Sequence, residues 1–222
     1  MALMPPETLA IQQMRSAIDP AKFAAIKQRY QHIDPSPGFS KFVDLDTFLP
    51  MTYMHFRYAG LEKVCTPLDI LDIGTGAGYF PLLCQLKGHQ VHSTDLPFTE
   101  DIPATHFYQE MMDLLDVSCT GYRIQPFTQM PSFGGRFDLI TGFLVVFNNH
   151  READLWGPEE WAFFLDDLRQ THAKPHARLV VRLNRDPPDA SGRFYTPELL
   201  KYFKSQGAAI TGKMAEVISI QL

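Results

Sequence analysis

The sequence predicts an α/β fold in which parallel strands are joined by crossover helices. From about residue 68 onward, short apolar runs alternate with longer stretches of helical period. The first of these runs ends in a glycine-rich turn that opens a helix, as in a doubly wound sheet. The 222 residues are 45% hydrophobic and 20% charged, which is typical of one globular domain with a sizeable core.

The first sixty or so residues predict a helical cap, and we place the domain boundary between a cap at 1–66 and a main domain at 67–222. The stretch 7–30 has helical spacing that is broken at Asp19-Pro20. A second helical stretch covers 46–64, and no strand pattern occurs before residue 68.

The main domain contains seven apolar runs that we expect to be strands. They cover 68–73, 90–94, 121–125, 136–143, 178–183, 208–210 and 217–220. The last two runs flank a Thr-Gly-Lys turn and predict a hairpin. Helices are expected between the other runs, for example after Gly157-Pro158, where Trp161, Phe164 and Leu165 begin one apolar face, and after Thr196-Pro197, an N-cap followed by an N1 proline.

Composition and charge exclude several classes of protein. Lys and Arg (20) are scattered and outnumbered by Asp and Glu (25), so a nucleic-acid partner is disfavoured. No apolar run approaches the ~18 residues of a membrane span, and the first ten residues lack a secretion signal. We therefore expect a cytoplasmic protein without a membrane partner. The cysteines, Cys65, Cys84 and Cys119, have no C-x-x-C spacing, which argues against a disulfide framework or a structural zinc site.

The most informative segment is the glycine turn 74–78, which follows the first strand and reads G-x-G-x-G. Glycines let the backbone approach a ligand closely, and the helix N-terminus offers free amides. Asp95 ends the second strand about twenty residues later, where a carboxylate can accept hydrogen bonds from ribose hydroxyls. The dinucleotide fingerprint needs a small residue where this chain has Tyr79, so a nicotinamide-dependent oxidoreductase is the weaker alternative.

The segment from Asp72 to Gly78, with Asp95, the stretch 126–131 and the strand 137–140, resembles the class I S-adenosylmethionine-dependent methyltransferases in the same order along the chain. The resemblance covers roughly residues 68–222. It implies a Rossmann-like, mostly parallel sheet in the order 3-2-1-4-5-7-6 with an antiparallel last hairpin, and S-adenosylmethionine as the cofactor. A protein that binds the cofactor without turnover is a further alternative.

The resemblance also assigns site residues. Those expected to bind the cofactor are Tyr53, Arg57, Asp72, Gly74, Thr75, Gly76, Gly78, Tyr79, Asp95, Leu96, Phe127, Thr128 and Phe143. Many relatives carry an acid that bonds the adenine amino group, but this chain has Pro126-Phe127 there, so packing on Phe127 and polar contacts of Thr128 are expected instead.

Some assignments have alternatives. Asp95 can instead cap the segment before Pro97. Arg57, four residues after Tyr53, can grip the methionine carboxylate of the cofactor or pair with an acid such as Asp46 or Glu62.

His150 is the candidate general base, because it follows the fourth strand at the edge where acceptors bind in this fold. The alternative is a surface or structural histidine. The stretch 143–149 contains no carboxylate that could hold magnesium, and no N/D-P-P-Y/F signature occurs there. We therefore expect no metal and a small-molecule acceptor; the sequence leaves the acceptor's identity and the oligomeric state open.

Overall fold

The computed structural model describes residues 4–30, 42–97, 103–145, 147, 155–183, 195–212 and 217–222. Contacts within the chain divide it into two compact units: the first comprises Met1–Pro67 and Thr75–Tyr122, and the second Leu68–Gly74 and Arg123–Leu222. The helices of the expected cap lie in the first unit, and the domain boundary between residues 66 and 67 stays a prediction. In the described part of the chain, no helix has the length and apolar character needed to cross a bilayer.

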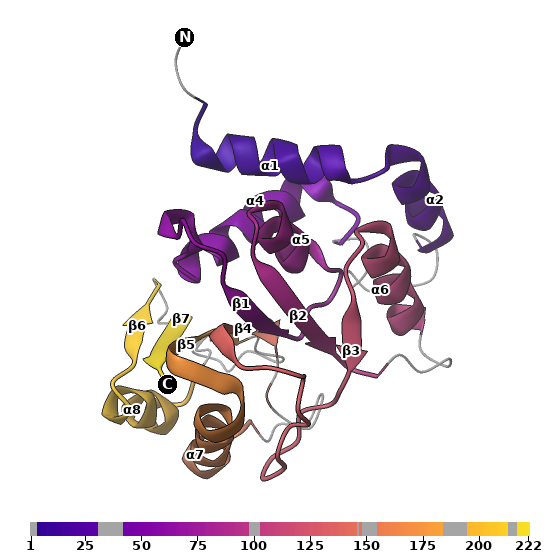
Figure 1. Cartoon of the computed structure of the whole chain (residues 1–222). Helices are drawn as coiled ribbons and strands as arrows, with labels where there is room; N and C mark the ends of the chain where they lie inside the picture. The colour runs from indigo at the N-terminus through magenta and orange to yellow at the C-terminus, as the bar shows by residue number, and fades with distance from the viewer. Residues whose placement is uncertain are drawn as a thin grey trace. The chain divides into compact units, whose positions relative to one another are not determined.

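The described residues form one seven-stranded sheet in the order β3-β2-β1-β4-β5-β7-β6 (Figure 1), which confirms the predicted order. The strands are β1 Asp69–Ile73, β2 Gln90–Asp95, β3 Cys119–Gly121, β4 Phe137–Val145, β5 Ala173–Leu183, β6 Ala209–Thr211 and β7 Val217–Gln221. The pairs β1–β4, β2–β3 and β4–β5 are parallel, whereas β7 is antiparallel to both β5 and β6. The predicted antiparallel hairpin is therefore confirmed.

Two strands differ from the predicted ranges by more than two residues. Strand β3 ends at Gly121, where the sequence predicts a strand at 121–125; Gly121 is opposite Asp95, the last residue of β2, so the chain beyond it has no partner strand. Strand β5 begins at Ala173 rather than at residue 178, because a register shift inserts a polar stretch. There Lys174 contacts Asp69 and Asp138, with N···O distances of 2.5 and 2.9 Å.

The first unit is rich in helices. They are α1 Pro6–Ala17, α2 Pro20–Tyr30, α4 Leu45–Tyr58, the 3₁₀ turn η1 Leu61–Lys63, α5 Tyr79–Leu86 and α6 Pro103–Leu114. The predicted break at Asp19 is confirmed, since its carboxylate accepts hydrogen bonds from the first amides of α2, Ala21 and Lys22. Helix α1 contacts α4 and α5, and α2 contacts α6 (Figure 1).

The second unit contains α7 Pro158–Asp167, which continues as the π-helical turn η2 Leu168–His172, and α8 Pro197–Ser205. Thr196 caps α8 as predicted, accepting from the Leu199 amide at 3.1 Å. The predicted apolar face of α7 is buried, with Trp161 fully enclosed. Trp156 is buried as well and packs edge-on against Phe147, with 5.1 Å between ring centroids, so it belongs to the core.

Candidate functional site

In the first unit, the glycine turn is joined directly to the end of β2. The Gly76 amide donates to Oδ2 of Asp95 at 2.5 Å, and the Leu96 amide donates to Oδ1 at 2.7 Å. The Thr75 amide donates to the Thr94 carbonyl oxygen at 3.1 Å. An ionised carboxylate has about four lone-pair positions, so two backbone donors leave capacity for two further hydroxyl groups.

The Asp95 carboxylate lies in a poorly solvated environment. Burial raises the pKa of Asp95, while the hydrogen bonds from Gly76 and Leu96 oppose that shift because they favour the ionised form. Burial also raises the pKa of the neighbouring Tyr108 phenol, and the negative charge of Asp95 adds to the effect. Asp95 therefore gains from further hydrogen-bond donors, such as the hydroxyls of a bound sugar.

Gly76 has φ +59°, a conformation that L-residues with side chains rarely adopt, and a Cβ built on it would meet nothing within 4 Å among the described residues. The turn therefore has free space at this residue. Gly78 is the N-cap of α5, whose first residue is Tyr79.

In the second unit, the chain approaches the turn through a tightly packed strand end. Asp72 is 3% exposed and accepts a hydrogen bond from the Thr141 hydroxyl at 2.7 Å. Strand β4 then has an irregularity between Phe143 and Val145, with Leu144 at φ +61°. A Cβ on Gly74 would lie 2.4 Å from Cγ2 of Val145, so only glycine fits there without a shift.

Three further predicted cofactor-binding residues lie in the second unit, and two of them, Phe127 and Thr128, are the predicted adenine contacts. Phe127 is 54% exposed with φ +53°, and its ring packs edge-on against Phe163, with 6.0 Å between centroids. Thr128 is exposed, and its hydroxyl donates to the Pro126 carbonyl oxygen at 3.2 Å. Phe143 is buried within β4. An aromatic ring this exposed is available for stacking by a planar ligand.

Three predicted residues of the first unit form hydrogen bonds or an ion pair with other residues of the chain. The Tyr79 hydroxyl donates to the Phe42 carbonyl oxygen at 2.7 Å. The Tyr53 hydroxyl donates to Oε1 of Glu62 at 2.5 Å, and Nε of Arg57 lies 3.6 Å from Oε2 of Glu62. Burial and the Glu62 contact raise the pKa of Tyr53 to about 12. This is the Arg57–Glu62 pairing that the sequence leaves open as an alternative, and carboxylate binding by Tyr53 and Arg57 stays a prediction.

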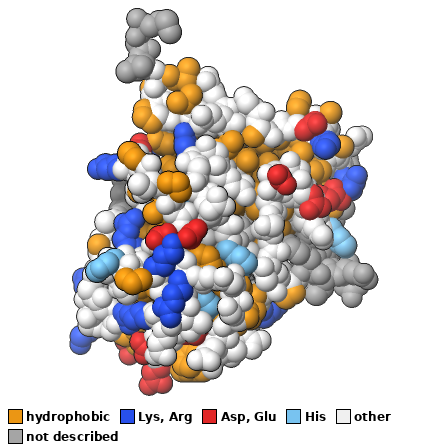
Figure 2. Space-filling view, in the orientation of Figure 1, with side chains coloured by type: hydrophobic (Ala, Val, Ile, Leu, Met, Phe, Trp, Pro, Cys, Tyr) orange, Lys and Arg blue, Asp and Glu red, His pale blue; other side chains and the backbone are white. Residues whose placement is uncertain are grey.

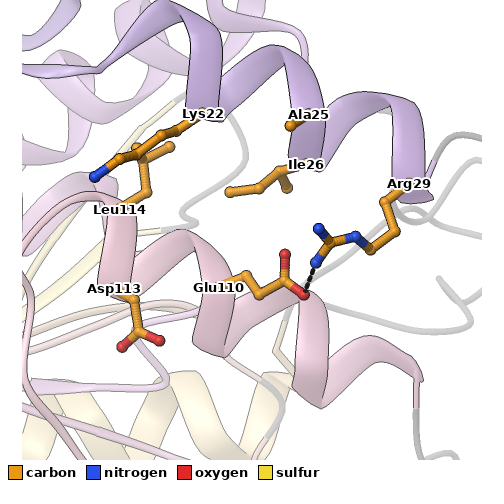
Figure 3. Close-up of a pocket in the computed structure, with 7 residues that line it drawn as sticks. All are labelled: Lys22, Ala25, Ile26, Arg29, Glu110, Asp113 and Leu114. Atoms are coloured by element: carbon orange, nitrogen blue, oxygen red, sulfur yellow. Dashed lines mark hydrogen bonds and ion pairs between the residues drawn. The ribbon is translucent and has the colours of Figure 1, made fainter.

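His150 lies outside the described residues, so its predicted role as a base stays a prediction. Within the described ranges, no group of three or more His, Cys, Asp or Glu side chains is placed to hold a metal ion. A hollow of about 290 Å³ lies between α2 and α6 (Figure 3). Charged residues line it, including the Arg29–Glu110 ion pair, but none of the predicted site residues does.

The sequence did not single out Thr141, Val145 or Tyr108. A threonine within an apolar strand was the only available signal for Thr141, since a buried hydroxyl needs a partner. The positions of Val145 and Tyr108 depend on a strand irregularity and on helix packing, which no local pattern reveals.

The sheet order, its antiparallel last hairpin and the glycine turn after β1 define the Rossmann-like fold of the class I methyltransferases. The PH0226 protein from Pyrococcus horikoshii OT3 is 13% identical over 77% of this chain and 89% of its own, with a TM-score of 0.52. A candidate O-methyltransferase, Npun_R0239 from Nostoc punctiforme PCC 73102, is 17% identical with a TM-score of 0.52; the match covers 80% of this chain but only 58% of that protein. These likenesses show the fold. No protein-family model matches the sequence, and no curated protein is similar to it.

Proposed function

We propose that this chain binds S-adenosylmethionine and transfers its methyl group to a small-molecule acceptor. The observation that carries the proposal is the hydrogen bond from the Gly76 amide to the Asp95 carboxylate at 2.5 Å, together with the open space where a Cβ of Gly76 would lie. A carboxylate at the end of the second strand is the group that recognises a ribose in doubly wound sheets.

The residues of each unit fit a part of this cofactor. In the first unit, Asp95 would accept hydrogen bonds from the ribose hydroxyls, and Gly76 leaves space for close approach of the ligand. In the second unit, Phe127 would pack against adenine and Thr128 would supply polar contacts, while the Thr141 hydroxyl holds the Asp72 carboxylate in place. When bound, the cofactor supplies a methyl group already activated for in-line displacement, so the protein's tasks are alignment and exclusion of water.

Charge supports a small acceptor over a nucleic acid. The net charge of −5 does not favour a polyanion. On the face shown in Figure 2, most basic side chains gather on the left of the view, and acidic side chains lie directly beside some of them.

Calorimetric titration with S-adenosylmethionine and S-adenosylhomocysteine tests the proposal. Both should bind with similar affinity, because the contacts to adenosine and to the amino-acid moiety are common to them. A folded protein that binds neither at millimolar concentration would contradict it. The oxidoreductase alternative requires a fluorescence change with reduced nicotinamide cofactors. Binding without turnover would leave an acceptor library without methylated product.

His150 is the base in this proposal. Its replacement by alanine should lower turnover about 10²- to 10⁴-fold with nearly unchanged cofactor affinity, and the wild-type rate should rise with pH through about 6.5. If the pH profile persists in His150→Ala and only the Michaelis constant of the acceptor rises, His150 shapes the pocket and is not the base.

A further inference from the structure

Residues 126–136, which we call the adenine segment, run from the proposed adenine contacts to the start of β4. In the second unit, every third residue of this segment contacts α7 or its π-helical continuation. The contacts are Phe127 with Phe163, Met130 with Asp167, Phe133 with His172, and Arg136 with the carbonyl oxygens of Gln170 and Ala173.

The central contact is a buried hydrogen bond. The Met130 amide donates to Oδ2 of Asp167 at 2.9 Å, and both residues are about 95% buried. The Thr171 hydroxyl donates to the other carboxylate oxygen at 3.3 Å. Because a buried amide without a partner is costly, the Asp167 side chain fixes the backbone of the adenine segment at Met130.

The π-helical turn explains why His172 lies beside the same carboxylate. An α-helix turns about 100° per residue, so residues five apart would lie about 140° apart around its axis. In a π-helix, hydrogen bonds join residues five apart, which brings residue 172 over residue 167. Nε2 of His172 is 3.9 Å from Oδ2 of Asp167, and its ring packs against Phe133 with 5.5 Å between centroids.

Arg136 holds the end of this turn. Its guanidinium donates to the Ala173 carbonyl oxygen at 2.8 Å and to the Gln170 carbonyl oxygen at 2.5 Å. These two carbonyls lie where the helix ends and β5 begins, so the arginine supplies the partners that a helix terminus lacks.

We infer that Asp167 and His172 are positioning residues for cofactor binding: the π-helical turn holds the adenine segment in one conformation and thereby sets the affinity and base selectivity for the adenine end of the cofactor. The inference rests on the proposed function. It adds a set of residues that touch neither the cofactor nor the acceptor and act through the backbone of the adenine segment.

Asp167→Ala tests the inference, with Asp167→Asn as the conservative variant and Phe203→Leu as a control. The alanine variant removes the acceptor of the Met130 amide, whereas asparagine retains an acceptor oxygen. Phe203 is buried on α8 in the same unit and packs against Trp161 of α7, with 5.1 Å between ring centroids, rather than against the adenine segment. Its substitution therefore lowers stability without removing a contact of that segment.

Three measurements are made on each protein: hydrogen exchange at the Met130 amide without ligand, the Kd of S-adenosylhomocysteine, and the Kd of its hypoxanthine analogue, S-inosylhomocysteine. In Asp167→Ala we expect faster exchange, at least a tenfold higher Kd for the adenine ligand, and a smaller preference for adenine over hypoxanthine. Asp167→Asn should stay within about threefold of the wild type, and Phe203→Leu should keep the wild-type preference.

Retention of wild-type affinity and preference by a folded Asp167→Ala would overturn the inference and leave the proposed function intact. Binding of neither nucleoside by the wild type would instead overturn the proposed function, and the inference with it. Should Asp167→Ala fail to fold, Phe163→Ala serves in its place. Phe163 is only partly buried, and its loss should reduce the adenine preference without global unfolding.

Discussion

Replacement of Asp95 by alanine should weaken binding of S-adenosylhomocysteine about ten- to a hundredfold while the protein stays folded. A hydrogen bond to a charged group contributes about 1.5–3 kcal/mol, and 1.4 kcal/mol corresponds to a tenfold change in Kd. Two ribose hydroxyls would donate to Asp95, but its oxygens already accept from the Gly76 and Leu96 amides. Because the hydroxyls share both oxygens with these amides, the expected loss of binding free energy corresponds to about one such hydrogen bond.

The stability of Asp95→Ala should change little, because two effects oppose each other. The Gly76 and Leu96 amides lose their acceptor, but the folded state no longer carries a carboxylate whose pKa is raised by burial. Calorimetry and thermal melts measure the two quantities, with the exposed Asp113 on α6 as a matched acid: Asp113→Ala should leave the Kd unchanged.

The pH dependence of the Kd is a second test of the role of Asp95. As the pH falls through its raised pKa, the wild-type carboxyl takes up a proton and loses acceptor capacity, so the Kd should rise; in Asp95→Ala this rise should be absent. An unchanged Kd together with a lower melting temperature would refute the reasoning and make Asp95 a cap of the segment before Pro97.

Further predictions concern the glycine turn and the buried histidine. Gly74→Ala and Gly76→Ala both place a side chain at positive φ, but only the first meets Val145, so thermal melts should show Gly74→Ala to be less stable by about 1–3 kcal/mol. Gly76→Ala should fold and bind S-adenosylhomocysteine more weakly; equal affinity in calorimetry would show that no ligand approaches Gly76. Burial lowers the pKa of His172, although Asp167 opposes this, so the unfolded state binds the proton first. The free energy of unfolding should therefore fall as the pH drops below about 6.5, and urea denaturation should show a shallower fall in His172→Phe. An identical slope in both proteins would contradict this.

The strands could be predicted because each buried strand carries its own apolar run, whereas their order in the sheet followed from the resemblance to the class I methyltransferases. The ends of two strands could not be predicted. The sequence could not show that β5 begins at Ala173, since Lys174 and its neighbours are polar and are held there by Asp69 and Asp138 from elsewhere in the chain. Nor could it show that β3 stops at Gly121, because that depends on where β2 ends.

The candidate site shows the same division. The positions of Gly76 and Asp95 could be predicted because each follows one of two successive strands, and in the structure a hydrogen bond of 2.5 Å joins them. The pairing of Arg57 with Glu62 depends on the turn between α4 and η1, so a helical pattern could suggest the pair but not choose it. Asp167 gave no signal at all, because the sequence pattern of a π-helical turn does not differ from that of an α-helix.

The close approach of Gly74 to Val145 also constrains how this chain can vary among its relatives. A residue larger than glycine at position 74 needs a residue smaller than valine at position 145, because the added Cβ would lie 2.4 Å from Cγ2 of Val145. The two positions should therefore change together in homologous sequences. In the laboratory, the double variant Gly74→Ala, Val145→Ala should recover the part of the lost stability that comes from the contact with Val145, but not the part due to the positive φ of residue 74, and a double-mutant cycle should show a favourable coupling energy.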